Sequence, residues 1–593
     1  MSPEQKRARL AQILRRKILD AGVHPLSPSE EQMWLLQALS PESRAQNAQM
    51  AAYLDGPLDV GALERSLTEI VRRHEVLRTT YPAPAGAPLR KVGELSPIAL
   101  PVIDLRGAGD PEAEVITRIG EAIDTTFDLT RGPLFFASLY RLGDERHVLL
   151  LREHHVIADA WSLGVFTREI EALYPAFAAG SPSPLPEPPL QYLEYAAWQQ
   201  ERMATDVLPS HLGYWKDKLQ GAPRSIALPT DFPRPRAMTL QGARPSIKLP
   251  EDLVVAVIDT GDRFEATPFV VMLTALNVLL YRWTSQSDLV IGTVSANRSR
   301  SGLEGLIGCF TNVLPLRTSL CPDDTAAQAI ERVMTTVLES YAHQECPFKS
   351  IVTACRGERR PDRNPLFNVA FQLQSLPFMD GTYLPAELAV SLRTASQRGA
   401  RAQRLGRDLE ARWAILEPNA APLDLRFLAV PEPGNPRGLS VGCEHNSNLF
   451  SRSTAERLLE GYQGVLEQLV RGLDAKLATF TLPSPLTARS AGKSSLGGGP
   501  GPGILEARAP AAPQNDTEEH IAELFRGALK TDDLGVDDSF FERGGDSLGA
   551  VQVLAHIGGA FGLELPLRIL VEAPTVRGLA DQVDRLLGKA RHA

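Results

Sequence analysis

Two adjacent histidines, His154 and His155, are followed four residues later by Asp159, and these side chains have the chemistry of an acid–base site. Histidine has an ordinary pKa close to neutral pH, so its neutral ring can take a proton from an amine or hydroxyl and return it. The carboxylate either acts on an imidazole or anchors the loop by pairing with a cation. Taken as bare residue types, the pair is more often a strand edge beside a capping aspartate. Metal binding is not predicted, because no third His or Cys stands at ligand spacing nearby.

The residues around this pair predict a strand, a tight loop and a helix. Residues 147–162 read HVLLLREHHVIADAWS, in which an apolar run ends at the histidines. Ser162 is expected to cap a helix whose apolar face contains Leu163, Phe166, Ile170 and Leu173. A histidine at such a strand-to-helix corner can expose a ring nitrogen in a cleft.

Length and composition limit the number of domains, the expected partners and the redox setting of the chain. A chain of 593 residues predicts two to four domains. The formal net charge is −9 and no long basic block occurs, so nucleic acid is not an expected partner. The five cysteines are odd in number and form no CxxC pair. They indicate a reduced, cytoplasmic setting without a disulfide framework or a metal.

Residues 1–22 are charged and amphipathic, and they predict a linker or docking helix. They lack the apolar centre of a signal peptide. No apolar run approaches the roughly 18 residues of a transmembrane helix, so no membrane contact is expected.

The pattern His154-His155-x-x-x-Asp159 resembles the HHxxxDG signature of nonribosomal peptide synthetase condensation domains, with Ala160 in the place of glycine. Other segments resemble further motifs of that family and follow its order between about residues 27 and 470; they are RHEVLRT at 73–79, LVIGTVSANR at 289–298, LIGCFTNVLPLR at 306–317, HQECPF at 343–348 and DRNPLFN at 362–368. The resemblance implies an α/β (α+β) fold of the chloramphenicol-acetyltransferase type. Its two lobes would span residues 23–180 and 181–483, with the active site between them.

The resemblance also implies roles for individual side chains. His155 would contact an attacking amine, either as a general base or by orienting the nucleophile and steadying the tetrahedral intermediate. His154 would hold the loop, and Arg78 would form an ion pair with Asp159. The remaining residues expected to support the site are Trp161, Ser162, Asn297 and Arg298.

Ala160 departs from the family pattern, and two consequences are open. If the family glycine is needed because the backbone has a positive φ there, alanine destabilises the fold by about 1 kcal/mol or shifts the loop. If the glycine serves space, the added methyl group narrows the floor beside the histidines, and the acceptor is small or the activity reduced.

Two segments lie outside the motif pattern. Residues 395–413 are rich in Arg and Ala and are interpreted as an insertion, helical in part, on the surface or at a partner contact. Residues 484–516 are rich in Gly, Pro, Ser and Ala, and they predict a flexible linker.

Residues 517–589 predict a separate four-helix bundle. Gly544 and Gly545 allow a sharp turn before Ser547, which is expected at a helix N-terminus where backbone N–H groups favour a phosphate. A plain N-cap serine is the alternative. The segment FFERGGDSL resembles peptidyl carrier proteins, which implies that Ser547 carries covalent 4′-phosphopantetheine.

Together the two resemblances imply an acyltransferase that joins a donor acyl or peptidyl thioester to a carrier-bound amine, in antibiotic or other secondary metabolite biosynthesis. The expected partners are an upstream donor carrier protein, a phosphopantetheinyl transferase and downstream assembly-line domains. No adenylation domain separates the two units, so a trans-acting adenylation or loading enzyme is expected, or the chain is part of a longer assembly line. The alternatives are a degenerate fold that serves as a docking platform for trans-acting enzymes and an ester-forming acyltransferase.

Overall fold

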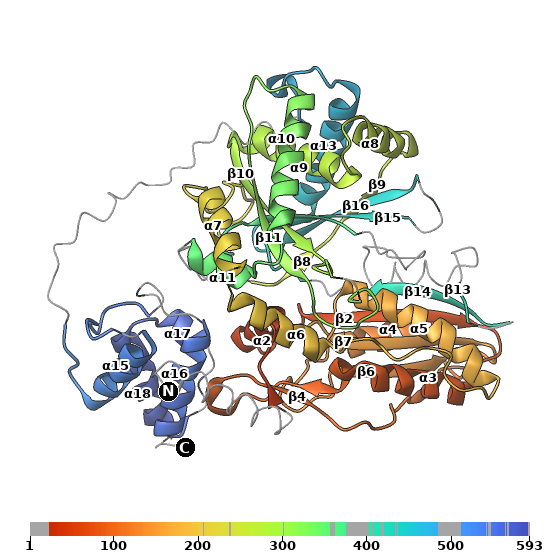
Figure 1. Ribbon diagram of the computed structural model, residues 1–593, viewed down its shortest axis with the longest axis horizontal. Coiled ribbons are helices and arrows are strands. Elements are labelled where there is room, and N and C mark those ends of the chain that lie inside the picture. Colours follow the sequence, from red (N-terminus) through yellow and green to blue (C-terminus); the bar gives the residue numbers. More distant parts are fainter. Residues whose placement is uncertain are drawn as a thin grey trace.

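The computed structural model describes residues 23–590, apart from residues 206, 236–238, 301, 356–361, 375–402, 406–407, 417–419, 433–434, 436, 484–510, 530, 541–542, 544–546, 564 and 566–567. In this part of the chain, two α/β lobes lie one above the other and a helical bundle stands beside them (Figure 1). The predicted two-lobed fold with a helical carrier unit is therefore confirmed.

The N-terminal lobe is built on a six-stranded sheet with the order β13 (Gln403–Arg404), β14 (Glu410–Leu416), β2 (Asn47–Asp55), β7 (Arg146–His154), β6 (Phe135–Arg141) and β5 (Val102–Asp104). Helices α3 (Val60–Arg73) and α5 (Ala160–Ala178) cover one face, and α4 (Pro111–Ile123) covers the other. Successive apolar residues of β7 enter these two cores alternately, as the pleat of a strand requires. The histidine pair thus lies at the end of a central strand that is covered on both faces.

The C-terminal lobe is built on a seven-stranded sheet with the order β11 (Asn312–Ser319), β10 (Asp288–Ser295), β12 (Val369–Leu373), β15 (Leu425–Pro431), β16 (Leu439–Asn446) and β8 (Gly242–Ala243), with β9 (Ser246–Lys248) also paired to β16. Helix α9 (Pro268–Thr284) is apolar on almost every side and lies buried among its neighbours. These neighbours are α8 (Glu251–Arg263), α10 (Ala326–Ala342) and α13 (Arg452–Arg471).

The structure corrects the interpretation of residues 395–413 and the assignment of everything after residue 181 to the C-terminal lobe. The described part of this segment is extended, not helical, and β14 pairs along its whole length with β2 of the N-terminal lobe. Arg412 of β14 also pairs with Asp55 of β2. The chain therefore returns from the second lobe to complete the sheet of the first. Residues 395–402 lie outside the described residues.

The remaining elements lie outside the two large sheets and outside the helices that cover them. A small sheet contains β1 (Val23–His24), β4 (Arg90–Val92) and β3 (Thr79–Thr80). The connecting helices and turns are α2 (Pro28–Leu39), η1 (Glu75–Arg78), η2 (Pro84–Gly86), α6 (Tyr192–Met203), α7 (Val207–Leu219), α11 (Phe348–Ala354) and η3 (Leu477–Thr479).

Contacts to three other parts of the chain fix the first turn of helix α2. Ser27 and Glu30 form a reciprocal capping box, so the helix begins at a defined residue. The Glu30 carboxylate is fully buried and also pairs with the guanidinium of Arg90. On the other side, the Lys349 ammonium lies 2.7 Å from a carboxylate oxygen of Glu31. The helix thus connects the N-terminal lobe to α11.

The C-terminal bundle contains α15 (Asp516–Leu529), α16 (Ser547–Phe561), α17 (Arg568–Glu572) and α18 (Val576–Ala590). It has its own apolar core, in which Phe525 and Phe540 meet edge to face with ring centres 4.8 Å apart. Leu35 and Leu39 of α2 pack against this core from outside, and α16 contacts η2. The bundle therefore touches the N-terminal lobe beside α2 (Figure 1).

Substitutions at the contact between the bundle and α2 are expected to separate the bundle from the N-terminal lobe. The double variant Leu35→Glu, Leu39→Glu places two charges at the apolar contact, and burying unpaired charges is strongly unfavourable. We expect the bundle to tumble independently, which ¹⁵N relaxation of the bundle amides would report as shorter correlation times. The variant Glu42→Lys, at an exposed site beyond the same helix, is the control. Unchanged relaxation in the double variant would contradict the contact.

Candidate functional site

The first histidine of the pair is a buried, neutral positioning group. His154 has no exposed surface, and its Nδ1 accepts the N–H of Val156 at 3.1 Å. The ring proton must then lie on Nε2, which donates to Oε1 of Gln37 at 3.3 Å. Burial and, to a smaller extent, the neighbouring His155 lower the pKa of His154 to about 3. His154 therefore holds β7 against α2 and does not exchange protons near neutral pH.

The second histidine has a different environment. His155 is half-buried, and its backbone N–H donates to Gln46 at 2.8 Å. Its Nδ1 lies 3.2 Å from the carbonyl oxygen of Ala158, which can only accept. Nδ1 therefore carries the ring proton, and Nε2 is the basic nitrogen of the neutral ring. This is the tautomer that a proton acceptor requires.

Asp159 is the anchor of the histidine loop. It is the N-cap of α5: Oδ1 accepts the backbone N–H of Ser162 at 2.9 Å and the hydroxyl of Ser162 at 2.7 Å. The other oxygen accepts the N–H of Phe310 at 3.1 Å. The cation at this carboxylate is Arg298, whose Nη2 lies 3.0 Å from Oδ1. Ser162 is the third helical residue, one turn inside the N-cap position expected for it.

The predicted ion pair between Arg78 and Asp159 is wrong. Arg78 ends the short turn η1, and its Nε donates to the carbonyl of Gly93 at 3.0 Å. Its nearest carboxylate oxygen belongs to Glu75, at 3.5 Å. Arg298 follows β10 of the other lobe, and only the folded chain brings it to Asp159. Both arginines lie within motif segments, so the sequence offered no means to choose between them.

Both terminal nitrogens of the Arg298 guanidinium form hydrogen bonds. Its Nη1 donates to the carbonyls of Leu303 and Leu306 at 2.5 and 2.7 Å. Its guanidinium lies 4.0 Å from the ring centre of Phe310 and 5.6 Å from that of Trp161. A planar guanidinium can make these contacts together, and a lysine ammonium cannot. The ion pair thus connects a loop of the C-terminal lobe to the histidine loop.

Ala160 and Trp161 occupy the first turn of α5. Ala160 begins the helix, and the residues with positive φ other than glycine in the described chain are Glu265, Ser285 and Asn297. The strain considered for alanine at this position is therefore absent, and only the added methyl group distinguishes it from glycine. The Trp161 indole donates to the carbonyl of Glu304 at 2.9 Å, which is a second bridge between the lobes.

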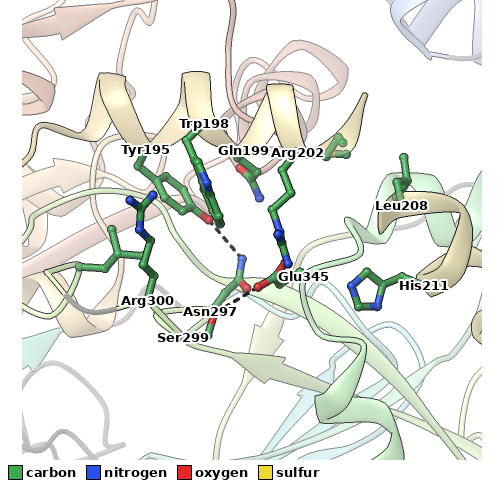
Figure 2. Close-up of a pocket in the computed structure, with 12 residues that line it drawn as sticks. Tyr195, Trp198, Gln199, Arg202, Leu208, His211, Asn297, Ser299, Arg300 and Glu345 are labelled. Carbon is green, nitrogen blue, oxygen red and sulfur yellow. Dashed lines mark hydrogen bonds and ion pairs between the residues drawn. The ribbon is translucent and has the colours of Figure 1, made fainter. Parts of the chain in front are cut away.

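Two neighbouring clefts lie between the lobes. The larger holds about 430 Å³ of open space and lies between α6, α7 and the residues that follow β10 (Figure 2). The smaller holds about 240 Å³ and lies between α2 and α11. Gln199 and Asn297 line both clefts, so they mark the place where the two meet. Asn297 directly precedes Arg298, which ties the clefts to the histidine loop.

Glu153 is a site residue that the motif reading passed over. It is 6% exposed, and its Oε1 has no hydrogen-bond partner in the described part of the chain. Burial and, to a smaller extent, the nearby charge of Asp159 raise the pKa of Glu153 to about 8. Glu153 is therefore mainly protonated at neutral pH. A carboxyl directly before a buried histidine in an apolar strand was the signal available in the sequence.

Ser547 is the first residue of α16, as predicted for a residue at a helix N-terminus. Its side chain and residues 544–546 lie outside the described residues. The helix dipole and the first backbone N–H groups of a helix of this length favour a phosphodiester at that end. The described backbone thus fits the predicted attachment site.

The described residues contain neither a metal-binding cluster nor a single membrane-spanning helix. No group of three or more His, Cys, Asp or Glu side chains could hold a metal ion there. No single helix in that part of the chain is long and apolar enough to cross a membrane. By length and composition alone, only the pair α8 and α9, bent by 106° at its break, could do so.

Family models match nearly the whole described chain. A condensation domain matches residues 20–490, and a phosphopantetheine attachment site matches residues 519–583. The chain therefore belongs to the condensation domain family and also contains a domain that carries covalent 4′-phosphopantetheine on a serine. Both resemblances read from the motifs are confirmed.

Named relatives agree with this assignment. Chondramide synthase cmdD from Chondromyces crocatus is 37% identical over 79% of the chain, which spans 11% of that synthase. Phosphinothricin tripeptide synthetase PhsC from Streptomyces viridochromogenes is 35% identical over 74% of the chain, which spans 38% of that enzyme. The X-domain from teicoplanin biosynthesis superposes with a TM-score of 0.66 and 26% identity, covering 77% of this chain and 97% of that one. The chain thus spans a minor part of each of the two curated synthetases.

Removing either candidate partner of Asp159 is expected to lower the free energy of unfolding by a different amount. Arg298→Met leaves a buried carboxylate without its cation, and breaking a buried ion pair costs roughly 3–5 kcal/mol. Arg78→Met removes a part-exposed contact and is expected to cost about 1 kcal/mol or less. Urea unfolding of the condensation domain, followed by tryptophan fluorescence, measures both. Equal losses in the two variants would contradict the pairing.

Replacing Glu153 by a residue that cannot ionise is expected to stabilise the protein by an amount that depends on pH. When folding raises the pKa of a carboxyl group, the protein is most stable below the ordinary pKa of that group, near 4.5. The free energy of unfolding then falls as the pH rises toward the folded-state pKa of about 8. Relative to wild type, Glu153→Gln should therefore gain stability between these pH values, by at most about 1.4 kcal/mol per pH unit. Urea unfolding from pH 5 to 9 tests this, with Glu460→Gln at an exposed site as control. A difference between Glu153→Gln and wild type that is constant with pH would exclude a buried, neutral Glu153.

Proposed function

We propose that the chain is a condensation enzyme of nonribosomal peptide synthesis, which forms an amide between a donor thioester and an amine held on the attached carrier. The observation that carries this proposal is the tautomer of His155. Its Nδ1–H is held by the Ala158 carbonyl, so Nε2 is the basic nitrogen of the neutral ring at the end of β7. An Asp159–Arg298 pair that joins the two lobes holds the loop around it.

The reaction needs little more than alignment of two tethered reactants. The amine nitrogen attacks the thioester carbonyl carbon, the C–N bond forms, the C–S bond breaks, and the amine proton must leave. Nε2 of His155 can take that proton, because the resulting imidazolium still donates from Nδ1 to Ala158. Alternatively, His155 orients the amine and steadies the tetrahedral intermediate. In either case, positioning contributes a large part of the acceleration.

The attached carrier is the proposed acceptor carrier. When bound to Ser547, phosphopantetheine supplies a thiol that holds the aminoacyl group as a thioester. The bundle contacts α2 and η2 of the N-terminal lobe, so this lobe lies within its reach. We propose that a phosphopantetheinyl transferase modifies Ser547, that a separate adenylation or loading enzyme charges it, and that an upstream carrier protein brings the donor.

A docking platform is the second candidate function. A similar solved structure supports this alternative. It is a complex of the X-domain and OxyB from teicoplanin biosynthesis, with a TM-score of 0.65 and 26% identity to this chain. In this chain, the geometry of His155 and the anchored Asp159 favours catalysis instead.

The His155→Ala variant separates the two functions. With phosphopantetheine on Ser547 charged with an aminoacyl group and a donor acyl-carrier added, wild type should form an amide product, measurable by intact mass. Removing a general base typically slows such a step by roughly 10²–10⁴-fold. Ser547→Ala should give no carrier-bound product.

The contrary outcomes have different meanings. Equal rates for wild type and His155→Ala would reduce the histidine to a bystander. No product from wild type with several donors and acceptors would favour the docking platform.

A further inference from the structure

A segment of the C-terminal lobe, residues 303–311, is enclosed by the N-terminal lobe. Four of its side chains, each at most 2% exposed, belong to the apolar core of that lobe; they are Leu303, Leu306, Ile307 and Phe310. The ring of Tyr192 lies so close to Gly308 that it leaves no space for a Cβ there. The segment is therefore tightly packed, and the groups that bind its backbone fix its position.

The backbone of residues 306–308 is bound at each residue by a different side chain. Arg298 donates to the carbonyl of the first residue at 2.7 Å, and the hydroxyl of Ser162 accepts the N–H of the third at 3.0 Å. Between them, the N–H of Ile307 donates to Nδ1 of His74 at 3.5 Å. Because a buried backbone N–H without an acceptor is strongly unfavourable, even this long bond constrains the segment.

His74 lies at the C-terminal end of α3, in the RHEVLRT motif, and is 2% exposed. Because its Nδ1 accepts an N–H, the proton of the neutral ring lies on Nε2. This nitrogen faces Oε1 of Glu169, which is 3.1 Å away. The same carboxylate accepts two hydrogen bonds from Arg73, at 3.0 and 3.1 Å. The carboxylate therefore has a cation of its own, and it orients the ring of His74 toward Ile307.

The segment that His74 binds also holds the anchor of the histidine loop. Phe310, three residues after Ile307, donates its N–H to Oδ2 of Asp159 at 3.1 Å. Asp159 in turn caps the helix that follows the loop of His155. A backbone shift at residue 307 would therefore reach this carboxylate. A displacement of about 1 Å at a reacting group can slow a reaction roughly 10²-fold.

We propose that His74 is a positioning residue for the condensation reaction. Its Nδ1 sets the position of residues 303–311, and this segment holds Asp159 and the loop of His155 in the geometry that amide formation requires. The inference rests on the proposed function. His74 is not one of the described residues that line the two clefts, so its effect is expected on the rate and not on the binding of either substrate.

Asparagine and glutamine separate the roles of the two ring nitrogens. In His74→Asn, the side-chain oxygen can take the place of Nδ1 and accept from Ile307, while the contact with Glu169 is lost. In His74→Gln, the side-chain amide can take the place of Nε2 and face Glu169, while the acceptor for Ile307 is lost. A purely structural histidine would give the same order of the two variants in stability and in rate, whereas a positioning residue gives opposite orders.

Hydrogen exchange of the full chain, followed by mass spectrometry, reports on residues 303–311 without requiring catalysis. We expect His74→Gln to speed exchange of the 307 amide roughly tenfold and His74→Asn to leave it near wild type. In the condensation assay, His74→Gln should lower kcat roughly tenfold at an unchanged KM for the donor carrier, and His74→Asn should stay within about twofold of wild type. Urea unfolding should rank His74→Asn as the less stable variant, because it loses the contact with a charged group.

Several results would overturn the inference. They are equal exchange at residue 307 in wild type and His74→Gln, a larger loss of kcat in His74→Asn than in His74→Gln, and a change confined to KM. If one variant does not fold, the comparison of the other with wild type still decides. No amide from wild type would refute the proposed function instead, and the exchange measurement would still decide whether His74 holds the segment. Glu460→Gln, at an exposed site of α13, is the control and should match wild type throughout.

Discussion

The buried ion pair between Asp159 and Arg298 is the interaction on which the rest of the site depends. Asp159 caps the helix that follows the histidines, and Arg298 comes from the opposite lobe. A buried pair contributes little net stability because both charges lose water, but it specifies geometry strictly. The hydrogen bonds of Arg298 to two backbone carbonyls and its contact with Phe310 replace part of the water that the guanidinium loses, although its buried Nε has no hydrogen-bond partner among the described residues. The relative position of the lobes is thereby linked to the loop that carries His155.

Beneath this pair, the protein keeps ionisable groups neutral. Burial holds His154 deprotonated and Glu153 protonated at neutral pH, so the strand end carries no charge of its own. The neutral His154 can then accept from Val156 and donate to Gln37, which a protonated ring could not do. Of the two histidines, His155 is left as the residue able to exchange a proton with a substrate.

Helix α2 connects parts of the molecule that the chain order separates. One face carries Leu35 and Leu39, which pack against the carrier bundle. Gln37 on the same helix bonds to His154, and Glu31 pairs with Lys349 of the C-terminal lobe. The carrier, the histidine strand and the second lobe therefore meet on one helix, beside the smaller of the two clefts.

The sequence by itself determined the family, the lobes, the carrier and the order of the motifs, because periodic apolar residues and short motifs are local properties. It identified the histidine pair, Asp159 and Ser547. Only the tertiary structure decided that Arg298 and not Arg78 pairs with Asp159, and that β14 belongs to the first sheet, since both depend on contacts between residues more than a hundred positions apart. The tautomer of each histidine and the neutral state of Glu153 were likewise decided by burial, which no local pattern of residues encodes.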